Sequence, residues 1–209
     1  MELKGNINFV TGKPKVILHL CAKEGSDSIC YRDAGYDVRI IGEEIGVENY
    51  NPPENVYGII ANPPCTMFSI ARTTAKTPRD LREGMRLVKE CLRIIWECQY
   101  QITEHQRIPP LKFWAIENPG TGFLTWFLGK PVFQYHPYEY GESYSKKTCL
   151  WGHFNLPKKP LLFNPVPTGR TIGQDERTFF GNEGKKSADM QTRSRCPIKF
   201  AEAFFEANL

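Results

Sequence analysis

The sequence predicts an α/β fold in which one open sheet is flanked by helices. Short apolar runs alternate with stretches of helical periodicity, and this alternation is typical of a sheet whose strands are joined through helices. Polar, proline-rich turns follow the apolar runs directly, and sheets of this kind bind ligands at the carboxyl ends of their strands. The 209 residues are enough for one sizeable hydrophobic core.

Four apolar runs are predicted to be buried strands because each is short and bounded by turn residues. They are residues 16–20, 38–41, 56–61 and 113–116. The third run ends at Asn-Pro-Pro and the fourth at Asn-Pro-Gly, and we expect proline to end a central strand at these points. Two further strands are expected at 132–140 and 148–151, around a turn at Gly141.

The clearest helix is predicted over residues 78–99. Apolar side chains recur there at steps of three and four, charged side chains fill the other face, and Pro78 stands where a first-turn proline is favoured. Shorter helices are expected at 27–34 and 123–128, and an amphipathic helix at 197–207. The segment 156–186, rich in Pro, Gly and Lys, is expected to be mostly irregular.

The composition is that of an ordinary globular chain, with 41% hydrophobic and 24% charged residues. No apolar run approaches the roughly 20 residues of a membrane span, and the N-terminus lacks the apolar centre of a signal peptide. We therefore expect a soluble cytoplasmic protein that does not bind membranes. The seven cysteines are scattered without a C-x-x-C pair, so neither a metal site nor a disulfide framework is expected.

Basic residues are concentrated in the last third of the chain, although the net charge is only +4. They come in pairs: Lys146 with Lys147, Lys158 with Lys159, Lys185 with Lys186, and Arg193 with Arg195. Paired cations in loops are able to meet phosphates. Ordinary solvated surface charge explains them equally well, and charge alone does not separate the two interpretations.

Cys65 is a candidate nucleophile. The turn after the third predicted strand, residues 62–69, reads Asn-Pro-Pro-Cys-Thr-Met-Phe-Ser. Two prolines hold the cysteine at a rigid, projecting corner, which suits a thiolate that must reach a substrate. The alternative is a buried structural cysteine in a proline-rich turn.

Glu117 is a candidate proton donor. It follows the apolar run 113–116 directly and precedes Asn118-Pro119-Gly120. A carboxyl group partly removed from water at the end of a strand has a raised pKa, which suits proton donation near neutral pH. The alternative is an acid that caps a turn.

Taken together, P-P-C-x-x-F-S at 63–69 and E-N-P at 117–119, at two strand ends with a long helix between them, resemble the cytosine-C5 methyltransferase family. Thr66 stands where that family has Gln, and Pro119 where it has Val. The resemblance implies a Rossmann-like class I sheet with flanking helices that binds S-adenosylmethionine.

The segment 18–26 and the following 33–38 resemble the family's cofactor motif. His19 stands where an acid is usual, and Lys23 and Ser26 where glycines are usual. The resemblance implies that an acid after the second strand accepts hydrogen bonds from the ribose hydroxyls of the cofactor. It also implies that Asn49 contacts the amino group of the cofactor's adenine. The implied cofactor residues are Leu20, Cys21, Ala22, Gly25, Ser26, Glu43, Glu44, Asn49, Asn62 and Pro64.

The segment 140–148 resembles the family's base-binding motif, with Lys146 and Thr148 at two positions that are Arg in the family. In the family, the arginine at the second of these positions binds the carbonyl group of the base. The implied catalytic residues are Cys65, Glu117, Asn118 and Lys146, and the implied substrate-binding residues are Ser69, Arg72 and Thr148. The stretch 69–76 is interpreted as a mobile loop that closes over the base, or as a plain polar linker.

The chemistry that the resemblance implies uses both candidates. The Cys65 thiolate adds to C6 of cytosine, Glu117 protonates N3, and Asn118 helps to hold that geometry. C5 then takes the methyl group, and loss of its proton and of the cysteine releases the product. In duplex DNA the base must first be flipped out of the stack.

The resemblance divides the chain into a catalytic core (1–155), a short irregular insert (156–189) and a C-terminal helix that completes the core (190–209). The insert stands in place of a full target-recognition domain. This implies low sequence specificity, a protein partner that supplies it, or a substrate other than duplex DNA. By analogy, the protein belongs in a bacterial or phage-infected cell.

Three alternatives remain open. In the first, the protein is a related enzyme whose substrate is RNA or a free cytosine nucleotide. In the second, it is a non-catalytic relative that binds nucleic acid, and the departures at His19, Lys23 and Ser26 favour this second alternative. Alternatively, Lys23 indicates a more acidic variant of the cofactor, although an exposed lysine on a turn is the simpler interpretation.

Overall fold

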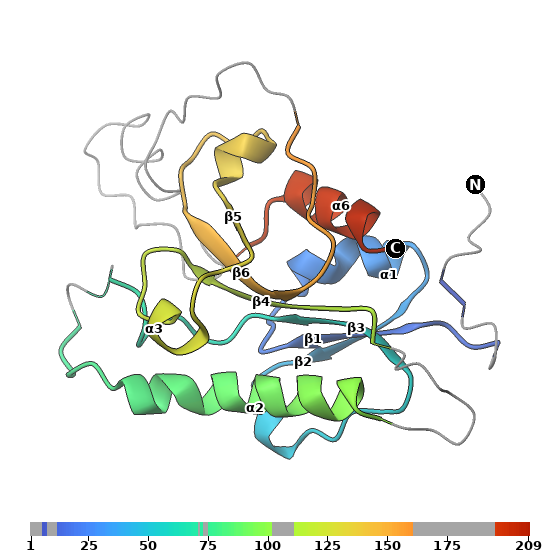
Figure 1. The fold of residues 1–209 in the computed structure, drawn as a ribbon, viewed down its shortest axis with the longest axis horizontal. Helices are drawn as coiled ribbons and strands as arrows, with labels where there is room; N and C mark the ends of the chain where they lie inside the picture. Colours follow the sequence, from blue (N-terminus) through green and yellow to red (C-terminus); the bar gives the residue numbers. More distant parts are fainter. Residues whose placement is uncertain (1–5, 8–11, 71, 73–74, 102–110, 161–194) are drawn as a thin grey trace.

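A single six-stranded sheet forms the centre of the molecule (Figure 1). The computed structural model describes residues 6–7, 12–70, 72, 75–101, 111–160 and 195–209. The strands are β1 (Val16–Leu20), β2 (Asp37–Ile41), β3 (Val56–Ala61), β4 (Phe113–Pro119), β5 (Phe133–Tyr135) and β6 (Thr148–His153). They lie in the order β2-β1-β3-β4-β6-β5.

The first four strands are parallel, whereas β6 is antiparallel to both β4 and β5. Strand β1 lies between β2 and β3, so the order of the strands along the sheet reverses there. The crevice outside the carboxyl ends of strands at such a reversal is the usual ligand site of an open α/β sheet. The residues after β1, β2, β3 and the parallel part of β4 therefore share one edge.

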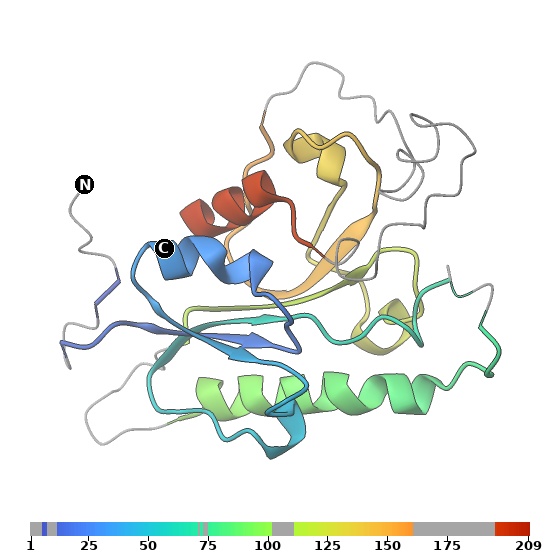
Figure 2. The ribbon, with the colours of Figure 1, turned by 180° about the vertical axis from the view of Figure 1, so that it is seen from behind.

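Helices cover both faces of the sheet (Figures 1 and 2). The long α2 (Leu81–Gln99) lies on one face, and α1 (Ile29–Asp33) and α6 (Ile198–Ala207) lie on the other. The short α3 (Thr125–Leu128) lies beyond the carboxyl end of β4, and three 3-10 turns, η1 (Ser26–Ser28), η2 (Val47–Asn49) and η3 (Pro137–Tyr140), complete the elements. None of the helices that the model describes is long and apolar enough to cross a membrane.

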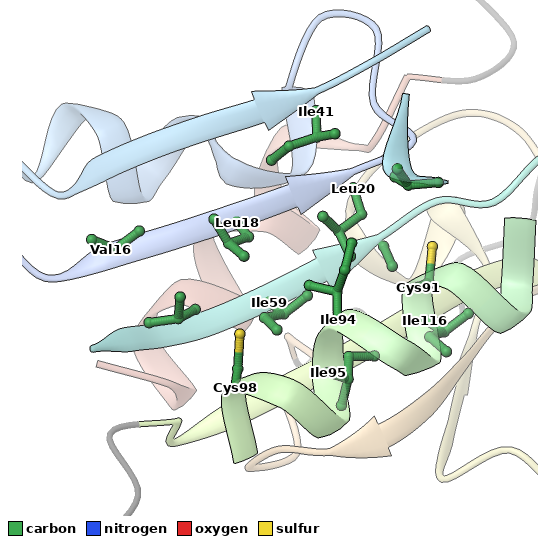
Figure 3. Close-up of a cluster of buried hydrophobic side chains, with 13 residues drawn as sticks. Val16, Leu18, Leu20, Ile41, Ile59, Cys91, Ile94, Ile95, Cys98 and Ile116 are labelled. Atoms are coloured by element: carbon green, nitrogen blue, oxygen red, sulfur yellow. The ribbon is translucent and has the colours of Figure 1, made fainter. Parts of the chain in front are cut away.

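The core under α2 is aliphatic (Figure 3). Alternate residues of β1, namely Val16, Leu18 and Leu20, point toward α2 because side chains alternate between the faces of a strand. They meet buried residues of the helix, among them Ile94 and Cys98. This packing fixes α2 parallel to the sheet and leaves its polar face to solvent.

The core on the opposite face is aromatic. Tyr31 of α1 stacks on Phe113 of β4 at 5.5 Å between ring centroids, and Phe200 of α6 stacks on Tyr135 of β5 at 3.8 Å. Phe204 packs edge-on against Phe113 at 5.7 Å. Residues from both ends of the chain are thereby packed over one face of the sheet.

The predicted mixed α/β architecture is confirmed, and β1 and β3 have the expected bounds. The fourth strand ends at the predicted Asn-Pro-Gly turn, but its expected last residue, Ile116, is wrong because β4 continues to Pro119. Pairing with β3 stops at Ile116, and beyond it β4 is flanked only by β6. Proline is tolerated there because this stretch of β4 lies at an edge.

Other element boundaries also differ from the predictions. Helix α2 begins at Leu81 rather than Pro78, because the Asp80 side chain caps it by accepting a hydrogen bond from Glu83 N at 3.0 Å. The expected strand 132–140 is shortened to β5, because Pro137 begins η3. The expected helix at 27–34 is split into η1 and α1, that at 123–128 shortens to α3, and that at 197–207 is α6.

Candidate functional site

One pocket opens at the carboxyl edge of the sheet, on the face covered by α1 and α6. Its empty volume is about 260 Å³, including the space at its open mouth. Its lining comes from segments that are far apart in the sequence: Asp27, Asn62, Glu117, Tyr135, Pro137, Tyr144, Lys146, Thr148, Arg195, Cys196 and Pro197. Four predicted site residues, Asn62, Glu117, Lys146 and Thr148, are brought together here.

A second, apolar space of about 270 Å³ adjoins this pocket between the sheet and α6. The sheet contributes Ile60, Ala115 and Leu150, and α6 contributes Phe200, Ala201 and Phe204. Asp27 and Glu117 line both spaces. The two carboxyl groups therefore form the boundary between a polar pocket and an apolar interior.

Glu117 is half-buried in β4, in the part of the strand that pairs with β6. Burial raises the pKa of its carboxyl group, Lys146 opposes this shift, and Asp27 adds to it. Asn62 Nδ2 donates a hydrogen bond to Glu117 Oε2 at 3.4 Å, which lowers the pKa again. With burial as the largest cause, Glu117 holds its proton to a higher pH than an ordinary glutamate, as a proton donor requires.

His19 determines how Asn62 is oriented. His19 Nε2 lies 2.7 Å from Asn62 Oδ1, and His19 Nδ1 lies 2.9 Å from Ser28 Oγ. A carboxamide oxygen only accepts hydrogen bonds, so Nε2 carries a proton. In the neutral ring Nδ1 is an acceptor and shares the Ser28 hydroxyl hydrogen with Gly25 O, to which Ser28 Oγ donates at 3.1 Å. The Asn62 amide nitrogen then points at two carboxyl groups, Asp27 Oδ1 and Glu117 Oε2, each at 3.4 Å.

The neutral form of His19 matches this arrangement. The side chain is 1% exposed, and burial lowers the pKa of its imidazole, although Asp27 and Asn62 oppose the shift. The position where the resembling family has an acid therefore holds a neutral donor in this chain.

Sequence reasoning missed Asp27. It follows Gly25-Ser26 of the cofactor motif and lies in η1, where Ser26 Oγ donates to Asp27 Oδ2 at 3.3 Å. Burial, and next to it the charge of Asp27, raises the pKa of the Cys196 thiol, which is hydrogen-bonded to the Asp27 side chain. The available signal was an acid two residues after Gly25, the glycine that remains of the resembling segment. The aromatic walls, Tyr135 and Tyr144, come from different segments and carry no spacing signal.

Lys146 and Thr148 approach the pocket from the start of β6. Thr148 is 2% exposed, and its Oγ1 donates to the carbonyl of Lys146 at 3.1 Å. The phenol of Tyr135 is hydrogen-bonded to the Thr148 side chain. Thr148 therefore lines the pocket as a buried hydroxyl held by neighbours, and Lys146 supplies positive charge beside Glu117.

Cys65 lies in the turn between β3 and α2 and is half-buried. Its carbonyl accepts hydrogen bonds from Phe68 N and Ser69 N at 2.9 and 2.8 Å, which closes the turn. Buried Asn118 donates through Nδ2 to Pro63 O at 2.9 Å and so ties the turn to the end of β4. Cys65 lines neither of the two pockets. The turn that carries Cys65 therefore lies next to β4, the strand of Glu117, but the Cys65 thiol does not line the pocket that Glu117 lines.

Apart from Asn62, the predicted cofactor residues line neither of the two spaces described above. The Leu20 side chain belongs to the core under α2, and Ala22 is also buried. Three acidic or amide side chains after β2, Glu43, Glu44 and Asn49, are exposed and line neither pocket. Pro64 is exposed as well.

The loop after β1 has an unusual backbone. Cys21 has φ of 56° and Gly25 has φ of 74°. A left-handed conformation at a non-glycine residue is uncommon and occurs often at ligand sites. A side chain at Gly25 would come within 2.7 Å of Ile40 Cδ1. Ser26 Oγ accepts from Cys196 N at 3.1 Å and thereby joins this loop to the segment before α6.

Ser69 and Arg72 do not line the pocket. The carbonyl of Ser69 accepts from Arg79 Nη2 at 3.0 Å, and Arg72 Nη2 donates to Thr77 Oγ1 at 2.6 Å. Closure of the loop 69–76 stays a prediction, since residues 71 and 73–74 lie outside the described part of the chain.

Most of the predicted insert and several of the basic pairs lie outside the described residues, namely 161–189, Lys185, Lys186 and Arg193. Lys159 is described and pairs with Glu139 at 2.8 Å. Across the described ranges, no three His, Cys, Asp or Glu side chains form a group that could hold a metal ion.

Comparison with known proteins adds no family to these observations. No family model matches the chain, and no curated protein matches it in sequence. Its function therefore has to be argued from the motifs and from the geometry of the pocket.

Proposed function

We propose that the protein transfers a methyl group from S-adenosylmethionine to C5 of cytosine in a nucleic acid, through a covalent bond between Cys65 and C6 of the base. The observation that carries the proposal is the convergence of Asn62, Glu117, Lys146 and Thr148 on one pocket. These residues come from three separate motifs, at 62–69, 117–119 and 140–148, and lie up to 86 positions apart in the sequence (62 to 148).

The fold agrees with a Rossmann-like class I methyltransferase. The sheet is open and largely parallel, its strand order reverses beside β1, and the cofactor-motif residues follow β1 and β2 at the carboxyl edge. Exposed Glu43 and Glu44 have the chemistry to accept hydrogen bonds from ribose hydroxyls. In this proposal the loop 21–26 and these acids hold S-adenosylmethionine, which supplies the methyl group.

Glu117 contributes the acid of the reaction. Its raised pKa keeps a proton available to donate to N3 of the base, and the amide of Asn62 holds the carboxyl group in place. Lys146 then compensates the negative charge that develops when the proton leaves. Protonation at N3 withdraws electrons from the ring and favours addition of a thiolate at C6.

Cys65 contributes the nucleophile. Because the thiol lies outside the pocket lining, the base must extend from Glu117 toward the turn, or the turn 65–69 must move toward the pocket. The hydrogen bond from Asn118 Nδ2 to Pro63 O keeps the start of this turn against β4 during either movement. After methyl transfer, loss of the C5 proton and elimination of Cys65 regenerate the thiol and the aromatic ring.

The test is the substitution Cys65→Ala, assayed by tritium release from DNA, tRNA and dCMP carrying tritium at cytosine C5. We expect release from at least one of these acceptors with the native protein and none with Cys65→Ala. Binding of S-adenosylmethionine, measured by calorimetry, should be unchanged. Cys30→Ala is the matched control because Cys30 is also half-buried but lies on α1.

Methyl transfer by Cys65→Ala at the rate of the Cys30→Ala control would refute the covalent mechanism. If the native protein neither releases tritium nor binds S-adenosylmethionine but still binds nucleic acid, the non-catalytic alternative is correct instead.

A further inference from the structure

Two large aromatic side chains project into solvent from α3. Trp126 is 70% exposed and Phe127 is 47% exposed. Ile70, in the segment after Cys65, is 56% exposed. Single exposed apolar residues are normal on a surface, whereas several on adjoining segments are a candidate interaction site. We call Trp126, Phe127 and Ile70 the α3 platform.

The α3 platform is built onto the turn that carries Cys65. Phe123 N donates to Phe68 O at 3.1 Å, and Ile70 N donates to Thr121 O at 3.3 Å. Ser69 and Gly122 form an isolated antiparallel bridge between the same two segments. Figure 1 shows α3 beside the chain that leads from β3 to α2, at the end of the sheet where β4 terminates. Whatever binds to the α3 platform therefore also approaches the Cys65 turn.

The rings are held in position before any partner binds. The Trp126 ring packs edge-on against Phe123 at 4.6 Å, and the Arg79 guanidinium lies over Phe123 at 4.7 Å. Phe127 packs against Phe68 at 6.4 Å. Rings that are already ordered lose little conformational entropy on binding, which favours their use as contact surfaces.

The segments that form the α3 platform contain no acidic residue. Residues 65–79 include Arg72, Lys76 and Arg79 but no Asp or Glu, and residues 119–138 include Lys130 and no Asp or Glu. Lys76 and Lys130 are exposed. Exposed Asp80 follows Arg79 directly, and its carboxylate accepts from Glu83 N at the start of α2. Exposed rings beside more basic than acidic residues have the chemistry of a binding site for a phosphate backbone with accessible bases.

We propose that the α3 platform stacks with unpaired bases of a single-stranded nucleic acid, next to the base that enters the pocket. This inference rests on the proposed function and narrows its substrate class. A free cytosine nucleotide has one base, which the pocket takes, so nothing remains to cover the platform. In an intact duplex the faces of the bases are stacked on one another, so only a single-stranded stretch offers faces to Trp126 and Phe127.

Equilibrium binding of a fluorescein-labelled 12-nucleotide DNA with a central cytosine tests the inference, measured by anisotropy without S-adenosylmethionine. Because stacking of one base on an aromatic ring changes affinity by about 5- to 150-fold, Trp126→Ala should weaken binding within that range. Trp126→Phe should restore most of it. Trp96→Ala is the matched control, since Trp96 is 57% exposed but lies near the C-terminal end of α2. The Trp96→Ala variant should bind the strand with the affinity of the native protein.

Two companion ligands separate stacking from charge. An abasic strand of equal length should bind the native protein at least as weakly as the base-bearing strand binds Trp126→Ala, and its binding should not change with Trp126→Ala. Lys130→Ala should weaken binding of both strands and reduce the slope of log affinity against log salt by about 0.7, the value for one phosphate contact in a single strand. A blunt duplex should be insensitive to Trp126→Ala.

The inference is overturned if Trp126→Ala and Trp96→Ala bind the single strand equally, or if the loss is the same for the duplex. It is also overturned if light scattering shows that Trp126→Ala converts a dimer into a monomer, because the α3 platform is then an interface between copies. These outcomes leave the tritium-release result untouched. Conversely, a native protein that binds single strands through Trp126 but transfers no methyl group refutes only the proposed reaction.

Discussion

His19 and Glu117 show opposite pKa shifts with the same physical cause. Removal from water disfavours the charged form of any group, so burial lowers the pKa of the His19 imidazole and raises that of the Glu117 carboxyl. Asn62 lies between them and bonds to both. The part of the pocket wall formed by Asn62 and Glu117 therefore favours a protonated carboxyl group, which suits hydrogen bonding to a neutral base.

His19→Phe should destabilise the protein by about 1–3 kcal/mol, because the phenyl ring leaves the partly buried Asn62 Oδ1 without its hydrogen-bond donor, whereas Ser28 Oγ keeps its bond to Gly25 O. Urea unfolding at neutral pH measures the change. The matched control is His153→Phe at an exposed position on β6, for which a change within about 0.5 kcal/mol is expected.

The pH dependence of stability tests the same residue. Since the folded-state pKa of His19 is lower than its unfolded value of about 6.5, the unfolded chain takes up a proton that the folded state excludes. This contribution to stability is complete above that unfolded value and is lost as the pH falls toward the folded pKa. His19→Phe should lack this part of the slope below about pH 6.5. Parallel curves for the two proteins would contradict the assignment of a neutral, buried His19.

Among the elements, β6 makes the largest contribution to the site that could not be predicted from the sequence. It runs antiparallel to β4, and Glu117 pairs with Leu150 in the added stretch of the strand. Thr148, at the start of β6, pairs with both Pro119 and Tyr135. The motif 140–148 therefore meets the E-N-P motif through a strand pairing, which local propensity does not specify.

Helix α2 begins where a side chain caps it rather than where the helical periodicity begins. Asp80→Ala should destabilise the protein by about 0.5–2 kcal/mol, because Glu83 N loses its hydrogen-bond acceptor at the helix start. Asp80→Asn retains an acceptor and is the control, with little change expected. Urea midpoints of the three proteins provide the measurement, and equal losses for Ala and Asn would show that the charge matters instead of the cap.

At the scale of the whole molecule, the end of the chain closes the site. Cys196 and Pro197 line the pocket, and α6 follows them directly. Phe200 stacks on Tyr135, which lines the pocket too. Asn208 is bonded to Asn155 through its side chain and accepts from Tyr31 Oη at 3.3 Å through its carbonyl. The last residues thus join the first helix, the sheet and the pocket in one structure.

Phe204→Ala should cost about 3–5 kcal/mol of the free energy of unfolding, because it opens a cavity between α6 and Phe113. This is a large share of the roughly 5–15 kcal/mol of a typical domain. Ile198→Ala on the same helix is the control, since Ile198 is 49% exposed and its loss should matter far less. Chemical denaturation of both variants tests this, and similar losses would mean that α6 is not packed as described.

The amino-acid sequence by itself determined the alternation of strands and helices, the bounds of β1 and β3, and the two motifs around Cys65 and Glu117. These are local properties, because apolar periodicity and proline-containing turns act over a few residues. Only the tertiary structure decided that Asp27 and Cys196 share a pocket with Glu117, that His19 orients Asn62, and that Cys65 lies outside the lining. Contacts between residues far apart in the chain arise from packing and strand order, and no short stretch of sequence specifies them.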